Sequence, residues 1–150
     1  MIAYRIADGR HAIFDATGAM LCGGRWNSVG LRAIYAAESF AGALLEILVH
    51  ANASAPPKHH RVIQIFVPEK IGVETVSPHQ VKGWDEENMI SSRAFGDLWL
   101  RENRSAVLRV PSVPTQGREY NVVFNPAHPE FSLIRAGEPE PLRWDARLFR

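Results

Sequence analysis

The chain has 150 residues, of which 46% are hydrophobic and 22% are charged, and its 17 Lys and Arg against 16 Asp and Glu give a net charge of +1. A chain of this length buries one core of ordinary size, so we expect a single domain over residues 1–150. The composition excludes a disordered tail. The net charge by itself gives no reason to expect a nucleic-acid-binding protein.

The single cysteine, Cys22, excludes an internal disulfide, and no group of Cys and His residues has the spacing of a zinc site. The N-terminus lacks a basic segment followed by a long apolar run, and no stretch has the uncharged length that spans a bilayer. We therefore expect a cytoplasmic protein that holds no metal ion and has no contact with a membrane.

The first half of the chain is predicted to form three strands and one helix. The elements are a half-buried strand over 1–8, a strand over 31–37, a helix over 38–51, a loop over 52–60 and a strand over 61–68. Apolar residues alternate in the first strand, so Arg5 is expected to point away from the face formed by the larger ones. A glycine-rich loop, CGGRWNSVG, precedes the second strand, and Ser39 is the predicted N-cap of the helix.

The second half predicts one further helix among short strands. The elements are a short strand over 74–78, a turn-rich and mobile loop over 77–88, a helix around 94–99, strands over 105–112 and 121–126, and short strands over 131–135, 142–144 and 146–149. Ser91 or Ser92 is the expected cap of this helix. Strands mixed with two main helices indicate an α+β fold.

Glu46 is the most informative residue, because it is the only charge in the otherwise apolar run AGALLEILV. Apolar residues on nearly all sides of this helix predict that it is buried, and Glu46 with it. Burial of an unpaired carboxylate costs several kcal/mol, roughly, unless a partner or a solvent-filled cleft relieves it. Two interpretations follow: a pocket floored by Glu46 beneath the small residues Gly42 and Ala43, or a structural salt bridge between Glu46 and an arginine.

Four other polar positions are candidates for the same site. Arg25 lies in the glycine-rich loop and offers a fork of donors suited to phosphate, although a solvated loop charge fits equally. Tyr35, on the strand that leads into the helix, is read more simply as core packing. Ser112 lies close to two prolines that could fix the direction of its hydroxyl, and Asn121 flanks the next strand.

The simpler interpretation of Ser112 and Asn125 is that they make only turn hydrogen bonds. His128 raises the alternative of a Ser-His hydrolase, but the sequence has no G-x-S-x-G elbow and no evident acid partner. That alternative is therefore weakly supported.

Taken together, these motifs resemble the RES domain, the toxin of a class of bacterial toxin–antitoxin pairs, which is named for its Arg, Glu and Ser. The matching residues are Arg25 in GGRWNSVG, Glu46 in AGALLEIL and Ser112 in RVPS, followed by NVVFNPAHPEF. The resemblance extends from YRIAD at the start to DARLF at the end, although the segment over 72–96 carries little family signature and its role stays open.

The resemblance implies a fold similar to that of the ADP-ribosyltransferase toxins and an enzyme that consumes NAD+ as a substrate, with no prosthetic group. It implies that Arg5 and Arg25 contact the phosphates, that Tyr35 packs against nicotinamide or its ribose, and that Glu46 acts at the reacting ribose. Ser112 then binds a ribose hydroxyl or orients Glu46. The implied partner is a helix-turn-helix (Xre-like) antitoxin that covers the active site and alone contacts DNA, and a homodimer is expected within the complex.

The leading hypothesis is a toxin that depletes NAD+ by cleaving the nicotinamide–ribose bond, with water or phosphate as the acceptor. The alternative enzyme is a mono-ADP-ribosyltransferase that modifies a specific protein. Two non-enzymatic alternatives rank lower. One is a single-strand nucleic-acid module that uses the arginines and the four tryptophans, which scattered positive charge makes unattractive. The other is a protein-interaction module that has lost NAD chemistry.

Overall fold

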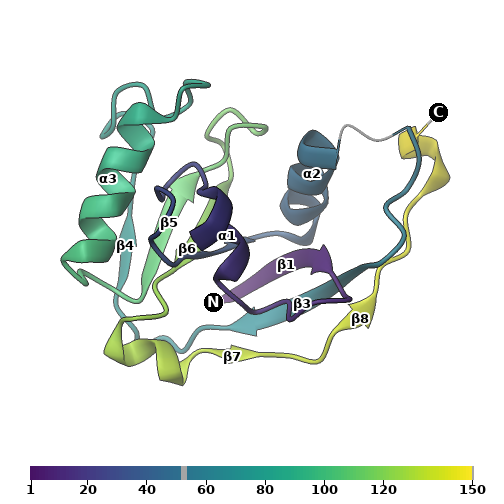
Figure 1. The fold of residues 1–150 in the computed structure, drawn as a ribbon, viewed down its shortest axis with the longest axis horizontal. Helices are drawn as coiled ribbons and strands as arrows, with labels where there is room; N and C mark the ends of the chain where they lie inside the picture. The colour runs from purple at the N-terminus through teal and green to yellow at the C-terminus, as the bar shows by residue number, and fades with distance from the viewer. Residues whose placement is uncertain (52–53, 150) are drawn as a thin grey trace.

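The computed structural model describes residues 1–51 and 54–149, which form one mixed sheet flanked by helices (Figure 1). In chain order the elements are β1 (Ile2–Asp8), α1 (Thr17–Cys22), β2 (Ile34–Ala37), α2 (Phe40–Ala51), β3 (His60–Phe66), β4 (Val73–Thr75), α3 (Ile90–Arg101), β5 (Val107–Pro111), β6 (Tyr120–Phe124), the 3-10 helix η1 (Pro129–Leu133), β7 (Arg135–Ala136), β8 (Glu140–Pro141) and the 3-10 helix η2 (Ala146–Phe149). The predicted α+β class is confirmed. Within the described ranges no helix is both long and apolar enough to cross a membrane.

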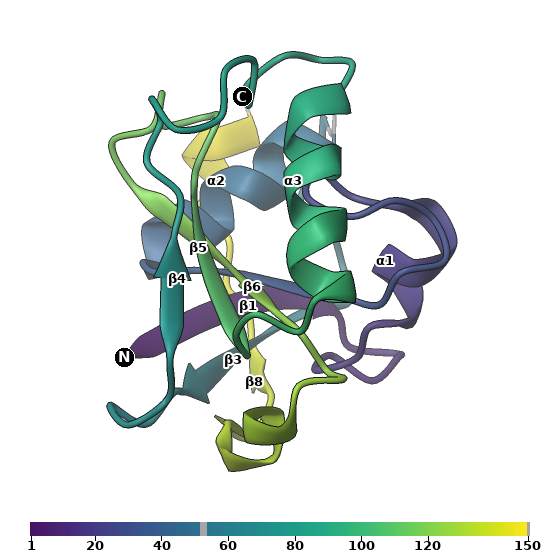
Figure 2. The same cartoon turned by 90° about the vertical axis from the view of Figure 1, so that its left-hand side faces the viewer.

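The strands follow the order β4-β5-β6-β2-β1-β3-β7, with β8 also paired to β3. Every pairing is antiparallel except that of β4 with β5, which is parallel. Helix α3 lies beside β4 and β5 and α2 packs on β1 and β2 (Figures 1 and 2), whereas α1 lies to one side of both helices in Figure 2. The two larger helices therefore cover different parts of the same sheet.

The sheet is joined in its middle by a very short pairing. Strands β1 and β2 share one register pair, Tyr4 with Ala37, whereas β1 pairs with β3 along its whole length. Beyond that pair the two strands separate, and the Arg5 side chain spans the gap by donating from Nη1 to the Tyr35 carbonyl at 2.7 Å. Unpaired strand carbonyls need such donors, because a buried polar group without a partner is costly.

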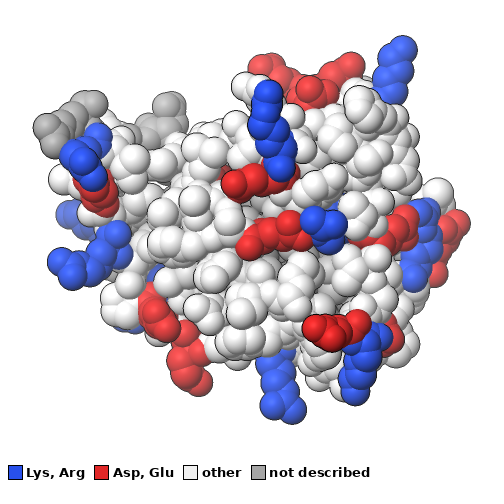
Figure 3. Space-filling model, turned by 180° about the vertical axis from the view of Figure 1, so that it is seen from behind, with Lys and Arg blue, Asp and Glu red and all other residues white. Residues whose placement is uncertain are grey.

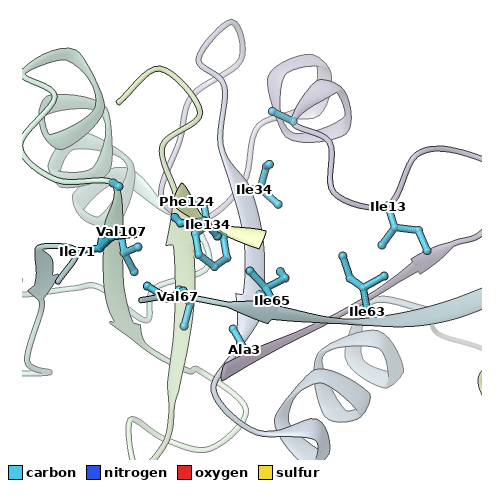
Figure 4. Close-up of a cluster of buried hydrophobic side chains, with 14 residues drawn as sticks. Ala3, Ile13, Ile34, Ile63, Ile65, Val67, Ile71, Val107, Phe124 and Ile134 are labelled. Atoms are coloured by element: carbon cyan, nitrogen blue, oxygen red, sulfur yellow. The ribbon is translucent and has the colours of Figure 1, made fainter. Parts of the chain in front are cut away.

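Strand β1 is covered on both faces, which corrects the prediction of a half-buried strand. Ala3 is fully buried in a cluster with residues of β2, β3, β5 and β6 (Figure 4). On the opposite face Ile6 packs with Ala43 of α2. The predicted direction of Arg5, away from Ile6, is confirmed, because its Nε donates to the Ile13 carbonyl at 2.6 Å on the Ala3 side.

Helix α3 packs directly on the backbone of the glycine-rich loop. A Cβ atom at Gly96 would lie 1.8 Å from the Trp26 carbonyl oxygen, so only glycine allows this approach. One residue later Asp97 accepts hydrogen bonds from the backbone N–H of Ser28 at 2.7 Å and from its hydroxyl at 2.5 Å. Helix α3 thereby holds the loop in place at Trp26 and Ser28.

The long elements were predicted correctly in type, and their ends differ by a few residues. The expected strand over 31–37 is shortened to Ile34–Ala37, and the helix expected over 38–51 begins at Phe40. The Ser39 hydroxyl accepts from the Gly42 N–H at 2.9 Å, which confirms the predicted N-cap. Residues 52–53 of the expected loop lie outside the described residues.

One helix was missed and one predicted helix cap was wrong. Helix α1 was not expected, because six residues are too few for an apolar period to be recognised. Helix α3 is not capped by Ser91 or Ser92, which lie inside its first turn. Instead Met89, in a left-handed conformation with φ of 58°, precedes the helix, and the Asn88 side chain accepts from the Ile90 N–H at 2.9 Å.

The C-terminal strands predicted over 131–135, 142–144 and 146–149 were also largely wrong. Two of these segments form the 3-10 helices η1 and η2, and only the two-residue strands β7 and β8 lie between them. Local capping decides this outcome: His128 Nδ1 accepts from the Glu130 N–H, and the Asp145 carboxylate accepts from the Arg147 N–H. Such side-chain bonds stabilise turns in preference to strands.

The segment over 77–88 is turn-rich, as predicted, and its mobility stays a prediction. It packs on the domain through Trp84, which is buried with Trp99 and Leu108. Arg25 reaches the same segment and donates from Nη1 to the carbonyls of Trp84 at 3.1 Å and Glu86 at 2.8 Å.

We expect Gly96→Ala to lower the free energy of unfolding by about 3 kcal/mol, because the added methyl group meets backbone that cannot move aside. The matched control is Gly18→Ala, where a Cβ meets nothing within 4 Å and the helix gains up to about 1 kcal/mol. Urea denaturation of the two variants checks this. Equal stability of the two variants would show that the loop and α3 can separate freely.

Candidate active site

A pocket of about 700 Å³ lies where β1 and β2 separate. It is lined by residues of β1, β2, α1, α2, β5 and β6, the glycine-rich loop and the first turn of α3. Four of the five predicted site residues line it: Arg5, Arg25, Tyr35 and Glu46. The fifth, Ser112, is buried and lies directly against Glu46. The predicted set is therefore brought together from positions spread over more than 100 residues of sequence.

Glu46 lies in a more open place than its helix pattern predicted. Only Gly42 and Ala43 of α2 are buried, whereas Val49 is 58% exposed and the Glu46 side chain is 26% exposed. The prediction of a buried helix was wrong because α2 contacts the sheet along one side only and borders the pocket on another. The pocket itself gives the carboxylate access to solvent.

Two neutral donors hold the Glu46 carboxylate. The Ser112 hydroxyl donates to Oε1 at 3.1 Å, and the Asn121 side-chain amide donates to the same oxygen at 2.7 Å. The other oxygen, Oε2, lies 3.9 Å from Nε2 of His50, one helical turn later. Among the described residues no arginine lies within 4 Å of this carboxylate, so the alternative of a structural Arg–Glu salt bridge is wrong.

Ser112 and Asn121 are brought together by the pairing of β5 with β6. Val110 is paired with Asn121, and the Ser112 N–H donates to the Glu119 carbonyl at 2.9 Å just beyond the ladder. The hydroxyl and the amide therefore project from adjacent strands toward α2. Sequence analysis noted Asn121 but assigned it no role, because the register of two strands is not visible in either strand alone.

The glycine-rich loop is built around the Tyr35 hydroxyl. This hydroxyl accepts from the Trp26 N–H at 3.0 Å and donates to Asn27 Oδ1 at 2.7 Å. A Cβ at Gly24 would lie 2.7 Å from the same oxygen, and Gly23 has a φ of +71°, so each glycine is required for a different reason. Burial raises the pKa of Tyr35 above its usual value, which keeps the hydroxyl protonated as a donor.

Asn27 closes the loop from inside. It is fully buried, and its amide donates to the carbonyls of Ala19 at 2.9 Å and Leu31 at 3.0 Å. The sequence GGRWN therefore encodes a tightly bonded loop whose backbone borders the pocket.

Three arginines line the pocket: Arg5, Arg25 and Arg93. Within the described part of the chain none of them has a carboxylate within 4 Å, and their hydrogen bonds go to backbone carbonyls. Burial lowers the pKa of Arg5, and the charge of Asp15 opposes this shift. The pocket thus combines positive charge that no carboxylate neutralises with one carboxylate, Glu46.

Sequence analysis missed Arg93 entirely, because it lies in the segment without recognisable motifs. Its Nε donates to the Gly24 carbonyl at 2.8 Å across 69 residues of sequence. His50 and Met89 also line the pocket and were not predicted. For His50 the sequence did offer a signal, because it follows Glu46 by four residues, and this spacing places both residues on one side of a helix.

Other candidates have structural roles. Asn125 accepts from the Ala127 N–H at 3.1 Å within its turn, but its amide also donates to the Asn103 side chain at 2.8 Å. The interpretation that Asn125 and Ser112 make only turn hydrogen bonds was therefore wrong, since the Ser112 hydroxyl donates to Glu46. His128 caps η1 and does not line the pocket, which argues against the Ser-His alternative. Within 1–51 and 54–149 no group of three or more His, Cys, Asp or Glu residues is arranged to hold a metal ion.

The tryptophans do not form a stacking surface. Trp26, Trp84 and Trp99 are at most 7% exposed and belong to one core cluster. On the face seen in Figure 3, acidic and basic side chains are interspersed and neither sign gathers into a patch. Single-strand binding needs exposed aromatic rings along a positive groove, so these observations weigh against the nucleic-acid alternative.

A mixed sheet that separates beside this pocket defines an α+β domain whose pocket is lined by more arginines than carboxylates. The RES domain matches residues 2–145, and the chain belongs to this family of toxins. This match confirms the family suggested by Arg25, Glu46 and Ser112.

Similar proteins span nearly the whole chain. The Prs ADP-ribosylating toxin of Sphingobium sp. (strain YBL2) is 39% identical over 140 residues, covering 91% of this chain and 86% of that protein. Toxin Res of Pseudomonas putida is 31% identical over 151 residues, covering 99% and 100%. A chain of the crystal structure of the M. tuberculosis MbcT–MbcA toxin–antitoxin complex matches with a TM-score of 0.75 at 19% identity, covering 94% of this chain and 83% of that one. That likeness shows that the two chains share a fold.

We expect Tyr35→Phe to lower the free energy of unfolding by about 1–3 kcal/mol, because it leaves the Trp26 N–H and Oδ1 of the Asn27 side chain without the Tyr35 hydroxyl. Tyr120→Phe is the matched control, since the Tyr120 hydroxyl makes no hydrogen bond within the described residues, and it should change stability by less than about 0.5 kcal/mol. Chemical denaturation of both variants gives the comparison. Similar losses in both variants would contradict the role of Tyr35 in the loop.

Proposed function

We propose that this chain is the toxin of a toxin–antitoxin pair and cleaves the bond between nicotinamide and ribose in NAD+, with water or phosphate as the acceptor. The observation that carries the proposal is the composition of the pocket. One carboxylate is held there by two neutral donors, and three arginines have no carboxylate within 4 Å among the described residues. NAD+ has the complementary charges, since its diphosphate is anionic and its nicotinamide end is cationic.

Glu46 suits the chemical step. As the glycosidic bond breaks, the bonding electrons leave with nicotinamide, which departs neutral, and positive charge develops on the ribose ring. An ionised carboxylate beside the ring stabilises that charge, as in glycoside cleavage. Ser112 and Asn121 orient the carboxylate without neutralising it, because neither carries a charge. The acceptor oxygen then bonds to the ribose carbon, and a proton is released if the acceptor is water.

The arginines and Tyr35 would bind the rest of the substrate. Guanidinium groups form charge-assisted and often bidentate bonds with phosphate oxygens, which suits Arg5 and Arg25. Tyr35 lines the pocket and offers an aromatic ring for nicotinamide or its ribose. NAD+ acts in this scheme as a substrate and not as a bound cofactor.

The second candidate function is mono-ADP-ribosylation of a specific protein. It is favoured by the name of the Sphingobium relative, an ADP-ribosylating toxin at 39% identity. Both candidates share the cleavage of the nicotinamide bond and differ in the acceptor. Mass spectrometry separates them: free ADP-ribose or its phosphate ester indicates depletion, whereas a mass gain on a protein indicates transfer.

The proposal includes an antitoxin partner. The MbcT–MbcA structure is that of a toxin–antitoxin complex, which supports an analogous arrangement here. We propose that a helix-turn-helix antitoxin covers the pocket and supplies all contact with DNA, and that the toxin is a homodimer within the complex. Activity is therefore to be assayed on the partner-free chain, because a protein that fills the pocket masks it.

We expect Glu46→Gln to abolish nicotinamide release from NAD+ while the protein stays folded. The folded state tolerates glutamine because both hydrogen bonds reach a single oxygen, which an amide also provides. The control is Glu69→Gln, because Glu69 is exposed and lies outside the pocket, and this variant should keep full activity. Full turnover by a folded Glu46→Gln protein would falsify the role given to Glu46.

We expect Ser112→Ala and Asn121→Ala each to lower kcat about 10- to 100-fold with a smaller change in KM, because each removes one donor that orients Glu46. The double variant should lose less than the product of the single effects, since the two donors share one acceptor atom. Steady-state kinetics measures both quantities. An increase in KM alone would assign these residues to substrate binding.

A further inference from the structure

Arg93 lines the same pocket as Tyr35, beside the glycine-rich loop, and takes no part in the predicted site. It occupies the first turn of α3, and its Nε donates to the Gly24 carbonyl at 2.8 Å. A Cβ at Gly23 would lie 3.2 Å from its Nη2, so the missing side chain at Gly23 leaves room for this end of the guanidinium. The side chain is half-buried and lines the pocket.

Most of the hydrogen-bonding capacity of Arg93 is unused by the described residues. A guanidinium has five N–H donors, and only the Nε donor of Arg93 has an acceptor there. No carboxylate of the described chain lies within 4 Å of it. The backbone bond therefore fixes the direction of the side chain and leaves its terminal nitrogens for a ligand.

Arg25 presents a second guanidinium to the same pocket, and it too has no carboxylate within 4 Å among the described residues. Its Nη1 is bound to the Trp84 and Glu86 carbonyls, and its other donors have no acceptor among the described residues. Burial raises the pKa of Tyr35. The charges of Arg93 and Arg25 oppose that shift and the charge of Asp97 adds to it, so all three lie within electrostatic range of one hydroxyl. Two guanidinium groups that line one pocket, with no carboxylate of the described residues within 4 Å of either, attract an anion.

We propose that Arg93 is a substrate-binding residue that, together with Arg25, binds the diphosphate of the dinucleotide. Helix α3, whose first half lies in the stretch without family motifs, then supplies part of the substrate's recognition. The site selects dinucleotides over nicotinamide ribosides that carry no phosphate. This inference rests on the proposed function for the identity of the substrate.

The test compares nicotinamide release from NAD+ and from nicotinamide riboside, which has the same scissile bond and no phosphate. The variants are Arg93→Gln, Arg93→Lys and the control Arg101→Gln, which changes an exposed arginine at the end of the same helix. Arg93→Gln should raise KM for NAD+ about 10- to 100-fold with kcat little changed. Arg93→Gln should leave the turnover of nicotinamide riboside unchanged. The KM of Arg93→Lys for NAD+ should lie between those of the wild type and Arg93→Gln, and the KM of Arg101→Gln should equal that of the wild type.

A merely structural role for Arg93 predicts a different result. Loss of the Gly24 contact would then disturb the loop and reduce turnover of both compounds equally, which overturns the inference. Unchanged KM for NAD+ overturns it too.

Failure of the proposed function is distinguishable, because the wild type would then release no nicotinamide from NAD+. In that case, or where nicotinamide riboside is not turned over, calorimetry with ADP-ribose decides. Affinity reduced about 10- to 100-fold in Arg93→Gln, with an unchanged melting temperature and normal binding by Arg101→Gln, supports the diphosphate site. Equal affinity in the two variants, or no binding by the wild type, overturns it.

Discussion

The separation of β1 from β2 after a single residue pair determines where the site can exist. A continuous ladder between these strands would close the sheet and leave no space for a pocket at its centre. The Tyr4–Ala37 pair holds the two halves together, and Arg5 satisfies the Tyr35 carbonyl that the missing ladder leaves exposed. The opening is thus stabilised by a charged side chain that itself borders the pocket.

The pocket holds arginines that have no carboxylate within 4 Å and a carboxylate that has no arginine within 4 Å among the described residues. Cations without carboxylate partners are costly in a folded protein, and this chain offsets part of that cost with backbone carbonyls at Arg5, Arg25 and Arg93. Carbonyl dipoles stabilise a guanidinium without neutralising it. Neutral donors hold Glu46 in the same way. The consequence is a site in which opposite charges are kept apart and stay available to a ligand.

Sequence reasoning identified most of the polar residues of the candidate site but not all of their geometry. Glu46 was conspicuous as one charge in an apolar run, and Arg25 and Ser112 followed from a family resemblance. The same apolar run misled on burial, because a helix beside a pocket needs apolar residues on more sides than a surface helix does. The C-terminal segments, which local capping turned into 3-10 helices, carried too short a pattern to distinguish from strands.

The sequence by itself determined the α+β class, the family, the principal strands and helices, and the residue types of the site. These follow from short-range patterns that a single chain displays along its length. Only the tertiary structure decided that Asn121 shares Glu46 with Ser112 and that Arg93 reaches Gly24. Both contacts join residues that are 69 or more positions apart in the sequence. They depend on strand register and on helix packing, which a short stretch of sequence does not determine.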